Sequence, residues 1–163
     1  MCFRVIYTVP KEKHTLKEEN SMMKDFYNEL KNLRNRYKEA TTEEEKNQLK
    51  DEYKDLDARI KERGEGFAWV FSLYEESQEK ENSRLDLGQN CIWDKDIPML
   101  LKGLEDAGIK EFTFSSTWSS SNKTAWEFTK AGWKLEGMTL VNTHKEWPTE
   151  NYKQEPAFIF TRG

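Results

Sequence analysis

Apolar side chains recur with a period of two at the beginning of the chain. Every second position from residue 3 to residue 9 is apolar, at Phe3, Val5, Tyr7 and Val9. This two-residue period is that of a β-strand, in which successive side chains point to opposite faces. Pro10 follows and cannot donate a backbone hydrogen bond to a neighbouring strand. The pattern therefore predicts a strand over residues 2–9.

From residue 11 to residue 63 the apolar positions change to a helical period. They recur at spacings of three, four or seven, at Leu16, Met23, Phe26, Leu30, Leu33 and Tyr37 and again at Leu49, Tyr53, Leu56 and Ile60. Between the two runs, Thr42 with Glu45 and Thr41 with Glu44 both have the spacing of a capping box, which marks a helix N-terminus. Two apolar seams joined by a short link predict an antiparallel helical hairpin.

The hairpin has two interpretations. In the first, each seam buries the other, which is the usual reason for paired seams. In the second, the hairpin is a protruding arm that grips a partner protein or pairs with a second copy of the chain as a homodimer. The residues that would contact such a partner are Leu16, Met23, Phe26, Leu49 and Tyr53.

Helical and extended patterns alternate in the remainder of the chain. Gly64 and Gly66 predict a hinge, followed by a short helix with Phe67, Val70 and Phe71 on its buried face. Two more helices and three more strands are predicted, the helices over 97–107 and 121–131 and the strands over 111–116, 135–142 and 157–161. The connections at 84–93 and 143–155 are predicted loops. Because apolar residues fall on both faces of the strand over 135–142, we expect it to be covered on both sides.

These elements predict an α+β fold. It consists of a four-stranded mixed sheet, helices packed on that sheet, and the antiparallel helical hairpin as an insertion. The short strand–helix–strand succession over 111–142 favours a parallel pair with a right-handed crossover. A length of 163 residues fits one domain, spanning 1–163, in which residues 11–63 form the hairpin arm.

Composition and charge restrict the class of protein. The formal net charge is −4 and the pI is about 5.4, so we expect no direct binding to nucleic acid. Cys2 and Cys91 are too few for a disulfide framework and fit a reducing compartment. No apolar run approaches the roughly 20 residues of a membrane span, and the beginning, MCFRVIYTV, lacks a secretion signal. We therefore expect a cytoplasmic protein without membrane contact.

The segment between the strand over 111–116 and the helix over 121–131 is rich in hydroxyl side chains. A helix N-terminus presents free N–H groups and the positive end of a dipole, so it can hold an anion. The candidate ligand-binding residues are Ser116, Trp118, Ser119, Ser120 and Asn122. In the alternative interpretation these residues only cap the helix and Trp118 packs inward. Tryptophans fill cores more often than they bind ligands, which applies equally to Trp126, Trp133 and Trp147.

Residues 97–161 resemble the C-terminal half of GNAT-type N-acyltransferases. Asn122-x-x-Ala125, then Phe128, then Gly132-Trp133 are similar to the N-x-x-A…G-F stretch of that family. The resemblance implies a helix, a strand, a second helix and two further strands.

The chain departs from that family at two places. Residues 88–94, GQNCIWD, lack the glycine-rich turn that holds the coenzyme A pyrophosphate, and Thr129 stands at the position of the catalytic tyrosine. We therefore expect no cofactor and no acetyl transfer.

A second resemblance covers more of the chain. The chain resembles a family of small uncharacterised proteins from gut Firmicutes and their phages and conjugative elements. The resemblance runs from the N-terminal Met1-Cys2 strand to the last strand, and its specific phrase is EFTFSSTWSS…TAW…AG.KLEGM, between Glu111 and Met138. It implies an accessory gene of mobile DNA and no particular activity.

Patterns that carry catalytic chemistry are scarce. His14 and His144, the two histidines, fall at the start of the hairpin and in a predicted loop. We assign no catalytic residue and no metal ligand, and the chain has neither a Walker loop nor a dinucleotide motif.

These observations favour a non-enzymatic binding protein of a mobile element or phage, acting through a protein partner. Its most concrete form is an inhibitor that masks a host defence enzyme such as a CRISPR effector. The alternatives are a GNAT-like acyltransferase and a sensor of a small ligand or nucleotide.

Overall fold

The structure is a computed structural model that describes residues 21–88 and 90–163. The strand predicted over 2–9, together with His14 and Leu16, lies outside the described residues. The elements in chain order are α1 (Ser21–Glu39), α2 (Glu43–Glu62), α3 (Glu65–Glu79), β1 (Leu85–Asp86), η1 (Asp94–Asp96), α4 (Ile97–Asp106), β2 (Glu111–Phe114), α5 (Ser121–Lys130), β3 (Lys134–Glu146) and β4 (Asn151–Thr161). Within these ranges, no helix has the length and apolar character needed to cross a membrane.

The predicted α+β class is confirmed by a four-stranded mixed sheet in the order β1-β2-β4-β3. β1 is parallel to β2, whereas β4 is antiparallel to both β2 and β3. β2 and β3, which the sequence pattern paired, are separated by β4. The strand β1 comes from residues 84–93, a predicted loop, because a two-residue strand is too short to show alternation.

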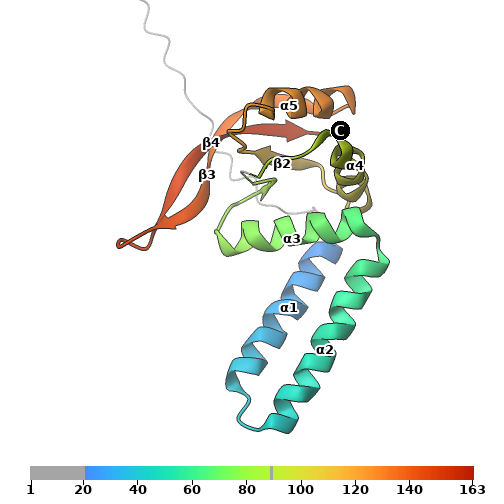
Figure 1. Cartoon of the computed structure of the whole chain (residues 1–163), viewed down its shortest axis with the longest axis vertical. Helices are drawn as coiled ribbons and strands as arrows, with labels where there is room; N and C mark the ends of the chain where they lie inside the picture. The colour runs from blue at the N-terminus through green and yellow to red at the C-terminus, as the bar shows by residue number, and fades with distance from the viewer. Residues whose placement is uncertain (1–20, 89) are drawn as a thin grey trace, which may run out of the picture.

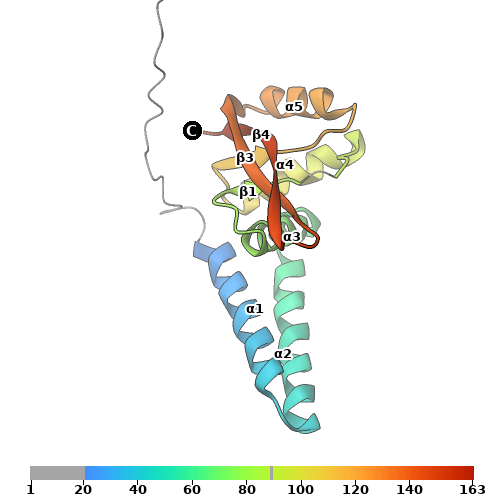
Figure 2. The same cartoon turned by 90° about the vertical axis from the view of Figure 1, so that its left-hand side faces the viewer.

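The sheet lies between α5 on one face and α3 on the other (Figures 1 and 2). Aromatic rings hold α5 in place. The ring of Phe128 packs edge-on against the rings of Phe112, Phe114 and Phe160, with centroids 5.2, 5.4 and 5.3 Å apart. The phenylalanines that alternate along β2 and β4 therefore form the floor on which α5 lies.

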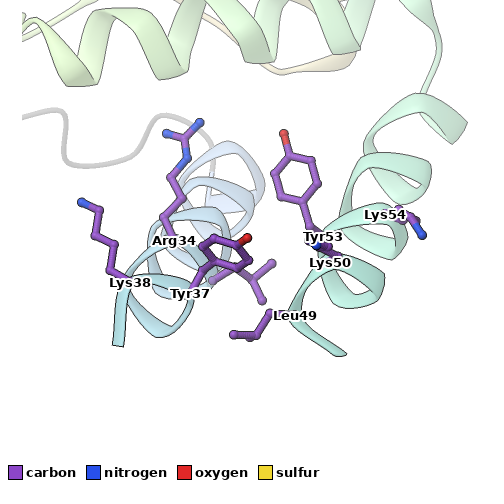
Figure 3. Close-up of a pocket in the computed structure, with 8 residues that line it drawn as sticks. Arg34, Tyr37, Lys38, Leu49, Lys50, Tyr53 and Lys54 are labelled. Carbon is purple, nitrogen blue, oxygen red and sulfur yellow. The ribbon is translucent and has the colours of Figure 1, made fainter. Parts of the chain in front are cut away.

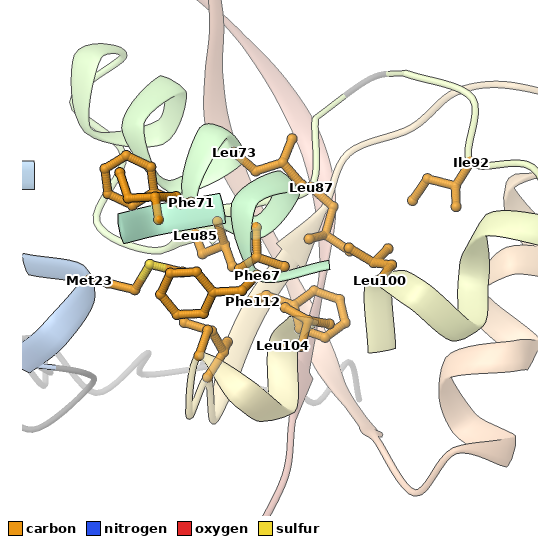
Figure 4. Packing of buried hydrophobic residues seen from close by; sticks show 14 of the residues in the cluster. Met23, Phe67, Phe71, Leu73, Leu85, Leu87, Ile92, Leu100, Leu104 and Phe112 are labelled. Atoms are coloured by element: carbon orange, nitrogen blue, oxygen red, sulfur yellow. The ribbon is translucent and has the colours of Figure 1, made fainter. Parts of the chain in front are cut away.

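A second part of the core joins α3 to the first turns of α1. Phe26 of α1 meets Phe67 and Phe71 of α3 edge-on, at 6.2 and 6.1 Å between ring centroids. Met23 is fully buried and belongs to the same hydrophobic cluster (Figure 4). The beginning of α1 is therefore part of the globular core.

Two glycines let α3 and α4 approach closely. Gly66 and Gly103 are both buried, and a Cβ on Gly103 would collide with the backbone carbonyl of Gly66. Gly66 was predicted to be part of a hinge, but it lies inside α3 and has a packing role. The turn between α2 and α3 depends on Gly64 alone, whose φ of +110° is readily adopted only by glycine.

The predicted helical hairpin is confirmed. α1 and α2 are antiparallel and project from α3 on the side away from the sheet (Figures 1 and 2). The capping box forms as expected, because the Glu45 N–H donates to Thr42 Oγ1 and the Thr42 N–H donates to a Glu45 carboxylate oxygen, both at 3.2 Å. Arg36 of α1 also donates to both carboxylate oxygens of Glu52 in α2, at 2.6 and 3.0 Å.

β3 and β4 continue as a long hairpin through residues 143–155, which the sequence pattern predicted to be a loop. The pairing extends to Glu146 opposite Asn151. Polar residues occupy both faces of this extension, so it has no apolar alternation to reveal it. It is fastened to the end of α3 and to the turn that follows, since the Tyr152 hydroxyl donates to the Glu79 carbonyl and the Asn142 N–H donates to Asn82 Oδ1, both at 2.8 Å.

The prediction that β3 is covered on both faces is wrong. Val141 is buried, but Leu135, Met138 and Leu140 are 48%, 61% and 57% exposed. These three are paired with the β4 residues Phe160, Phe158 and Pro156, on the face where α5 packs. A single helix covers the inner strands of that face and leaves the edge strand β3 exposed.

The α3–α4 contact can be tested by the substitution Gly103→Ala, for which packing and helix propensity predict opposite changes in stability. Gly103→Ala should raise stability by about 1 kcal/mol if only helix propensity matters. Because the added methyl group would collide with the α3 backbone, we expect the free energy of unfolding to fall by about 1–3 kcal/mol instead. Urea unfolding measures the difference, with Lys102→Ala on the exposed side of α4 as the control. A stabilised Gly103→Ala variant would contradict the close approach.

Candidate protein-binding surface

One face of the helical hairpin is hollowed into an apolar groove. The groove has a volume of about 470 Å³ and lies between α1 and α2 in the half of the hairpin distant from α3. Leu33 and Leu49 are buried at its floor, and Tyr37 and Tyr53 form its walls with 41% and 48% of their surfaces exposed (Figure 3). In a pair of helices, each apolar seam is covered only where it contacts the other helix. The remaining surface of these residues is therefore open to solvent.

The rim of this groove is basic. The other lining residues are Arg34, Lys38, Lys50 and Lys54, and no carboxylate is among them. Arg34 pairs with Glu75 and Glu79 of α3, and Lys54 pairs with Asp51 one turn away in α2. Lys38 and Lys50 have no ion-pair partner within residues 21–88 and 90–163 and are exposed. The apolar floor is therefore bordered by positive charge that the hairpin itself only partly neutralises.

The groove continues along α2 toward α3. A second hollow of about 260 Å³ shares Tyr53 with the first and has Leu56, Ile60 and Phe71 among its apolar lining. Its charged lining residues are of both signs, Asp57, Lys61 and Glu75. From Leu49 to Ile60 the α2 axis rises by roughly 17 Å, or about three helical turns. This length is suited to a short helix lying along the seam.

The opposite face of the hairpin has different chemistry. The hollow there is lined mainly by charged and polar residues, with Glu39, Glu45 and Gln48 among them. The two faces of one hairpin therefore differ, one being apolar with a basic rim and the other polar with both signs of charge.

Of the five residues predicted to contact a partner, two line the groove, two pack against α3 and one lies outside the described residues. Leu49 and Tyr53 line the groove. Met23 is fully buried, and Phe26 is partly buried with its ring packed against Phe67 and Phe71 of α3. Leu16 lies outside the part of the chain that the structure describes.

The basic rim was not singled out from the sequence, although a signal for it exists. Each of the four apolar lining residues is followed directly by a cation, in the pairs Leu33-Arg34, Tyr37-Lys38, Leu49-Lys50 and Tyr53-Lys54. Neighbouring positions on a helix are about 100° apart, so each cation stands beside the seam on the same edge. Once the seam is recognised, this repeated pair indicates the rim.

The serine-rich turn at the N-terminus of α5 is the second candidate site. The structure brings Ser116, Trp118, Ser119, Ser120 and Asn122 together there. Their polar groups do not converge on one point, because the Ser116 hydroxyl accepts from the Trp118 N–H at 3.5 Å and the Ser120 hydroxyl lies 3.7 Å from the Cys91 sulfur. Ser120 is the N-cap residue but makes no side-chain capping hydrogen bond. The turn therefore does not cap its helix through the Ser120 side chain, and ligand binding by these residues stays a prediction.

The tryptophans depart from the expected preference for the core. Trp133 is buried, but Trp118, Trp126 and Trp147 are 57%, 63% and 91% exposed. Trp118 and Trp126 fall at the beginning and on the outer side of α5, and Trp147 falls at the tip of the β3–β4 hairpin. Helical and strand periodicity do not identify such positions, because an isolated aromatic residue has no pattern.

A buried acid that the sequence did not reveal lies beneath the serine-rich turn. Asp86 ends β1 and is only 7% exposed. One of its carboxylate oxygens accepts from the Thr113 hydroxyl at 2.8 Å, and the other accepts from the Ser115 hydroxyl at 2.7 Å and from the Gly88 N–H at 3.0 Å. Asp86 therefore connects the ends of β1 and β2 to the loop that follows β1.

Burial raises the pKa of Asp86 above the ordinary range of an aspartate, and the donors from Ser115, Thr113 and Gly88 partly oppose this rise. A raised folded-state pKa means that the stabilising contribution of this carboxyl is complete below its unfolded pKa. It is then lost as the pH rises through the folded pKa.

The Asp86 cluster leads to a stability prediction. Ser115→Ala removes one donor to a buried carboxylate, so we expect the free energy of unfolding at neutral pH to fall by about 1.5–3 kcal/mol. The matched control is Ser116→Ala, whose hydroxyl is not bonded to Asp86. The Asp86→Asn variant cannot titrate at this position. As the pH falls through the raised pKa of Asp86, we therefore expect the original protein to gain stability relative to that variant. A difference that does not change with pH in urea unfolding would refute the assignment.

The match with known proteins covers the sheet and not the hairpin. A family model described as a domain of unknown function, DUF7698, matches residues 69–162. The matched segment begins within α3 and contains all four strands, so α1 and α2 lie outside it. Neither the curated proteins nor the solved structures give a match. Because the family model covers more than half of the chain, the chain belongs to the DUF7698 family.

Proposed function

We propose that this protein is a non-enzymatic binding protein that captures a helical segment of a partner protein in the groove of the α1–α2 hairpin. The observation that carries the proposal is the apolar floor of Leu33, Leu49 and two half-exposed tyrosines, bordered by cations. Tyrosine and arginine are enriched at protein interfaces, where an apolar centre is surrounded by a polar rim.

The chemistry of the groove specifies the segment. A third helix laid along two antiparallel helices completes a small bundle and covers the open side of both seams. In the part of the groove distant from α3, the cations on the rim, with no carboxylate among the lining residues, favour glutamates and aspartates on the flanks of that end of the helix. A second copy of the hairpin would bring a second set of lysines to the same rim, so like-charge repulsion disfavours a homodimer through this groove.

Masking of a partner needs no chemistry in the binding protein itself. In the role that we infer, the projecting hairpin holds the partner's helix while the sheet domain adds bulk beside it. A phage or mobile-element inhibitor of a host defence enzyme would act in this manner. The proposal is supported by the position of the hairpin, which projects from the part of the chain that matches the family model.

Acyl transfer is the alternative, and two contacts count against it. The loop after β1 would have to supply free N–H groups to a pyrophosphate, but the Gly88 N–H donates to Asp86. Thr129, at the position of the catalytic tyrosine, donates its hydroxyl to the Trp126 carbonyl at 2.7 Å. We expect no turnover of acetyl-coenzyme A with amines in a thiol-release assay, and saturable turnover would favour the alternative.

Designed peptides test the groove directly. The first probe is a helical peptide of about four turns with leucines at positions i, i+3, i+4 and i+7 and glutamates on its flanks. The second probe has lysines in place of the glutamates. We expect fluorescence anisotropy to show at least about tenfold tighter binding of the acidic peptide, with a preference that weakens as salt is added.

Variants on the two faces of the hairpin locate the binding. Tyr37→Ser with Tyr53→Ser should weaken binding of both peptides by about tenfold or more. Lys38→Glu with Lys50→Glu should reverse the charge preference. Gln48→Ala, on the polar face, is the control and should change neither result. Point substitutions are preferred to removal of the hairpin, because Met23 and Phe26 are part of the core. Binding that survives the tyrosine substitutions in variants with unchanged melting temperatures would overturn the proposal.

A further inference from the structure

The outer edge of β3 is an unpaired strand edge with apolar side chains beside it. β3 is the last strand in the order β1-β2-β4-β3, and no strand pairs with its outer edge within residues 21–88 and 90–163. Leu135, Met138 and Leu140 are about half exposed or more on one face of this strand. An edge of this kind is a template for pairing with another strand.

The middle of the β3 edge lacks the usual protection against such pairing. Edge strands are normally protected by charged residues, prolines, bulges or short length. From Gly137 to Val141 the pairing with β4 is regular and the sequence GMTLV carries no charge. At Asn142 the edge is already occupied, because its N–H donates to Asn82 Oδ1 at 2.8 Å and its C=O accepts from Asn82 Nδ2 at 3.0 Å. The irregularities and the charges lie on either side, with Lys134 and Glu136 before this segment and Lys145 and Glu146 after it. The strand therefore offers a regular, uncharged stretch between charged ends.

We propose that a second copy of this chain pairs with that stretch, edge to edge and antiparallel, so that two sheets join into one through β3. A two-fold axis perpendicular to the sheet places the α5 faces of both copies on the same side of the joined sheet. Residues directly opposite each other across the two β3 strands must therefore lie on the same face. If the axis passes at Thr139, Met138 of each copy lies opposite Leu140 of the other. Four exposed apolar side chains then meet in one cluster and leave the solvent.

The charges of the strand are compatible with this register. With the axis at Thr139, Gly137 of each copy faces Val141 of the other, so no charged residues are opposed between Gly137 and Val141. The pairing is confined to this stretch, because Glu136 lies at an irregularity and Asn142 is bonded to Asn82. An axis at Leu140 would place Met138 opposite Asn142 and leave it without an apolar partner. The apolar pattern thus selects one of the available registers. This pairing is independent of the hairpin groove, which belongs to other elements.

Sedimentation equilibrium tests the pairing with the full chain. We expect the original protein to shift from monomer to dimer as its concentration rises from the low to the high micromolar range. Met138→Lys with Leu140→Lys should keep the protein monomeric, since the proposed register places each new lysine opposite a new lysine. Met138→Glu with Leu140→Glu should do the same with negative charge. All four substitutions fall at exposed positions, so the fold and the melting temperature should be nearly unchanged.

Mixing the two charged variants provides the decisive result. In the proposed register every lysine of one variant lies opposite a glutamate of the other, so the mixture should form a heterodimer although each variant alone is a monomer. Trp126→Lys adds a charge to an equally exposed position on α5 and is the control, which should dimerise like the original protein.

Three outcomes would overturn the proposal. One is an original protein that stays monomeric at every concentration. Another is a dimer that persists in both charged variants. The third is a mixture of the two charged variants that does not associate.

Discussion

The backbone contact between α3 and α4 at Gly66 and Gly103 is the constraint on which the rest of the structure depends. It sets α3 close against α4, which connects β1 to β2. The same α3 then receives Met23 and Phe26 of α1 on one side. At its other end the Ser77 hydroxyl accepts from the Asp86 N–H at 2.9 Å, and the Glu79 carbonyl accepts from Tyr152. A change in the distance between α3 and α4 would therefore disturb the hairpin and the sheet together.

Around α3 the apolar side chains are covered and the buried polar groups are hydrogen-bonded within the molecule. On the helical hairpin and on β3, apolar side chains remain exposed. Around α3 and the central strands, side chains are buried and the carboxylate of Asp86 has three donors. On the hairpin, Tyr37 and Tyr53 leave about half of their surfaces in water, and on β3 Met138 and Leu140 leave more. Apolar surface left in water forgoes the stabilisation of burial, so surfaces of this kind in soluble proteins often mark interaction sites.

The two open surfaces differ in what they can recognise. The hairpin groove presents side chains only, because the backbone groups of α1 and α2 are bonded within each helix. It can therefore select a partner by shape and charge. The β3 edge presents backbone N–H and C=O groups, and these pair with any strand that reaches them, so selectivity must come from the side chains on either face. Binding a partner through the hairpin and pairing through β3 can thus occur together, since the two surfaces lie on different elements.

The sequence by itself determined the local elements. The seam over Leu30, Leu33, Leu49 and Leu56 predicted both helices of the hairpin, and Thr42 with Glu45 predicted where α2 begins. The alternation of Phe112 with Phe114, and of Phe158 with Phe160, predicted β2 and β4. These features succeed because they follow from periods and caps that act within one turn or one strand.

Only the tertiary structure decided which apolar residues are covered. Met23 and Tyr53 belong to the same seam pattern, yet Met23 is fully buried beneath α3 and Tyr53 is 48% exposed, because α3 crosses the hairpin at one end only. Leu140 and Phe160 fall on the same face of the sheet, yet only Phe160 is covered, because one helix spans the inner strands and ends short of the edge. The pairing of Asp86 with Thr113 and Ser115 likewise brings together residues more than twenty-five positions apart. A periodic pattern fixes the face on which a side chain lies, but coverage depends on where distant segments meet.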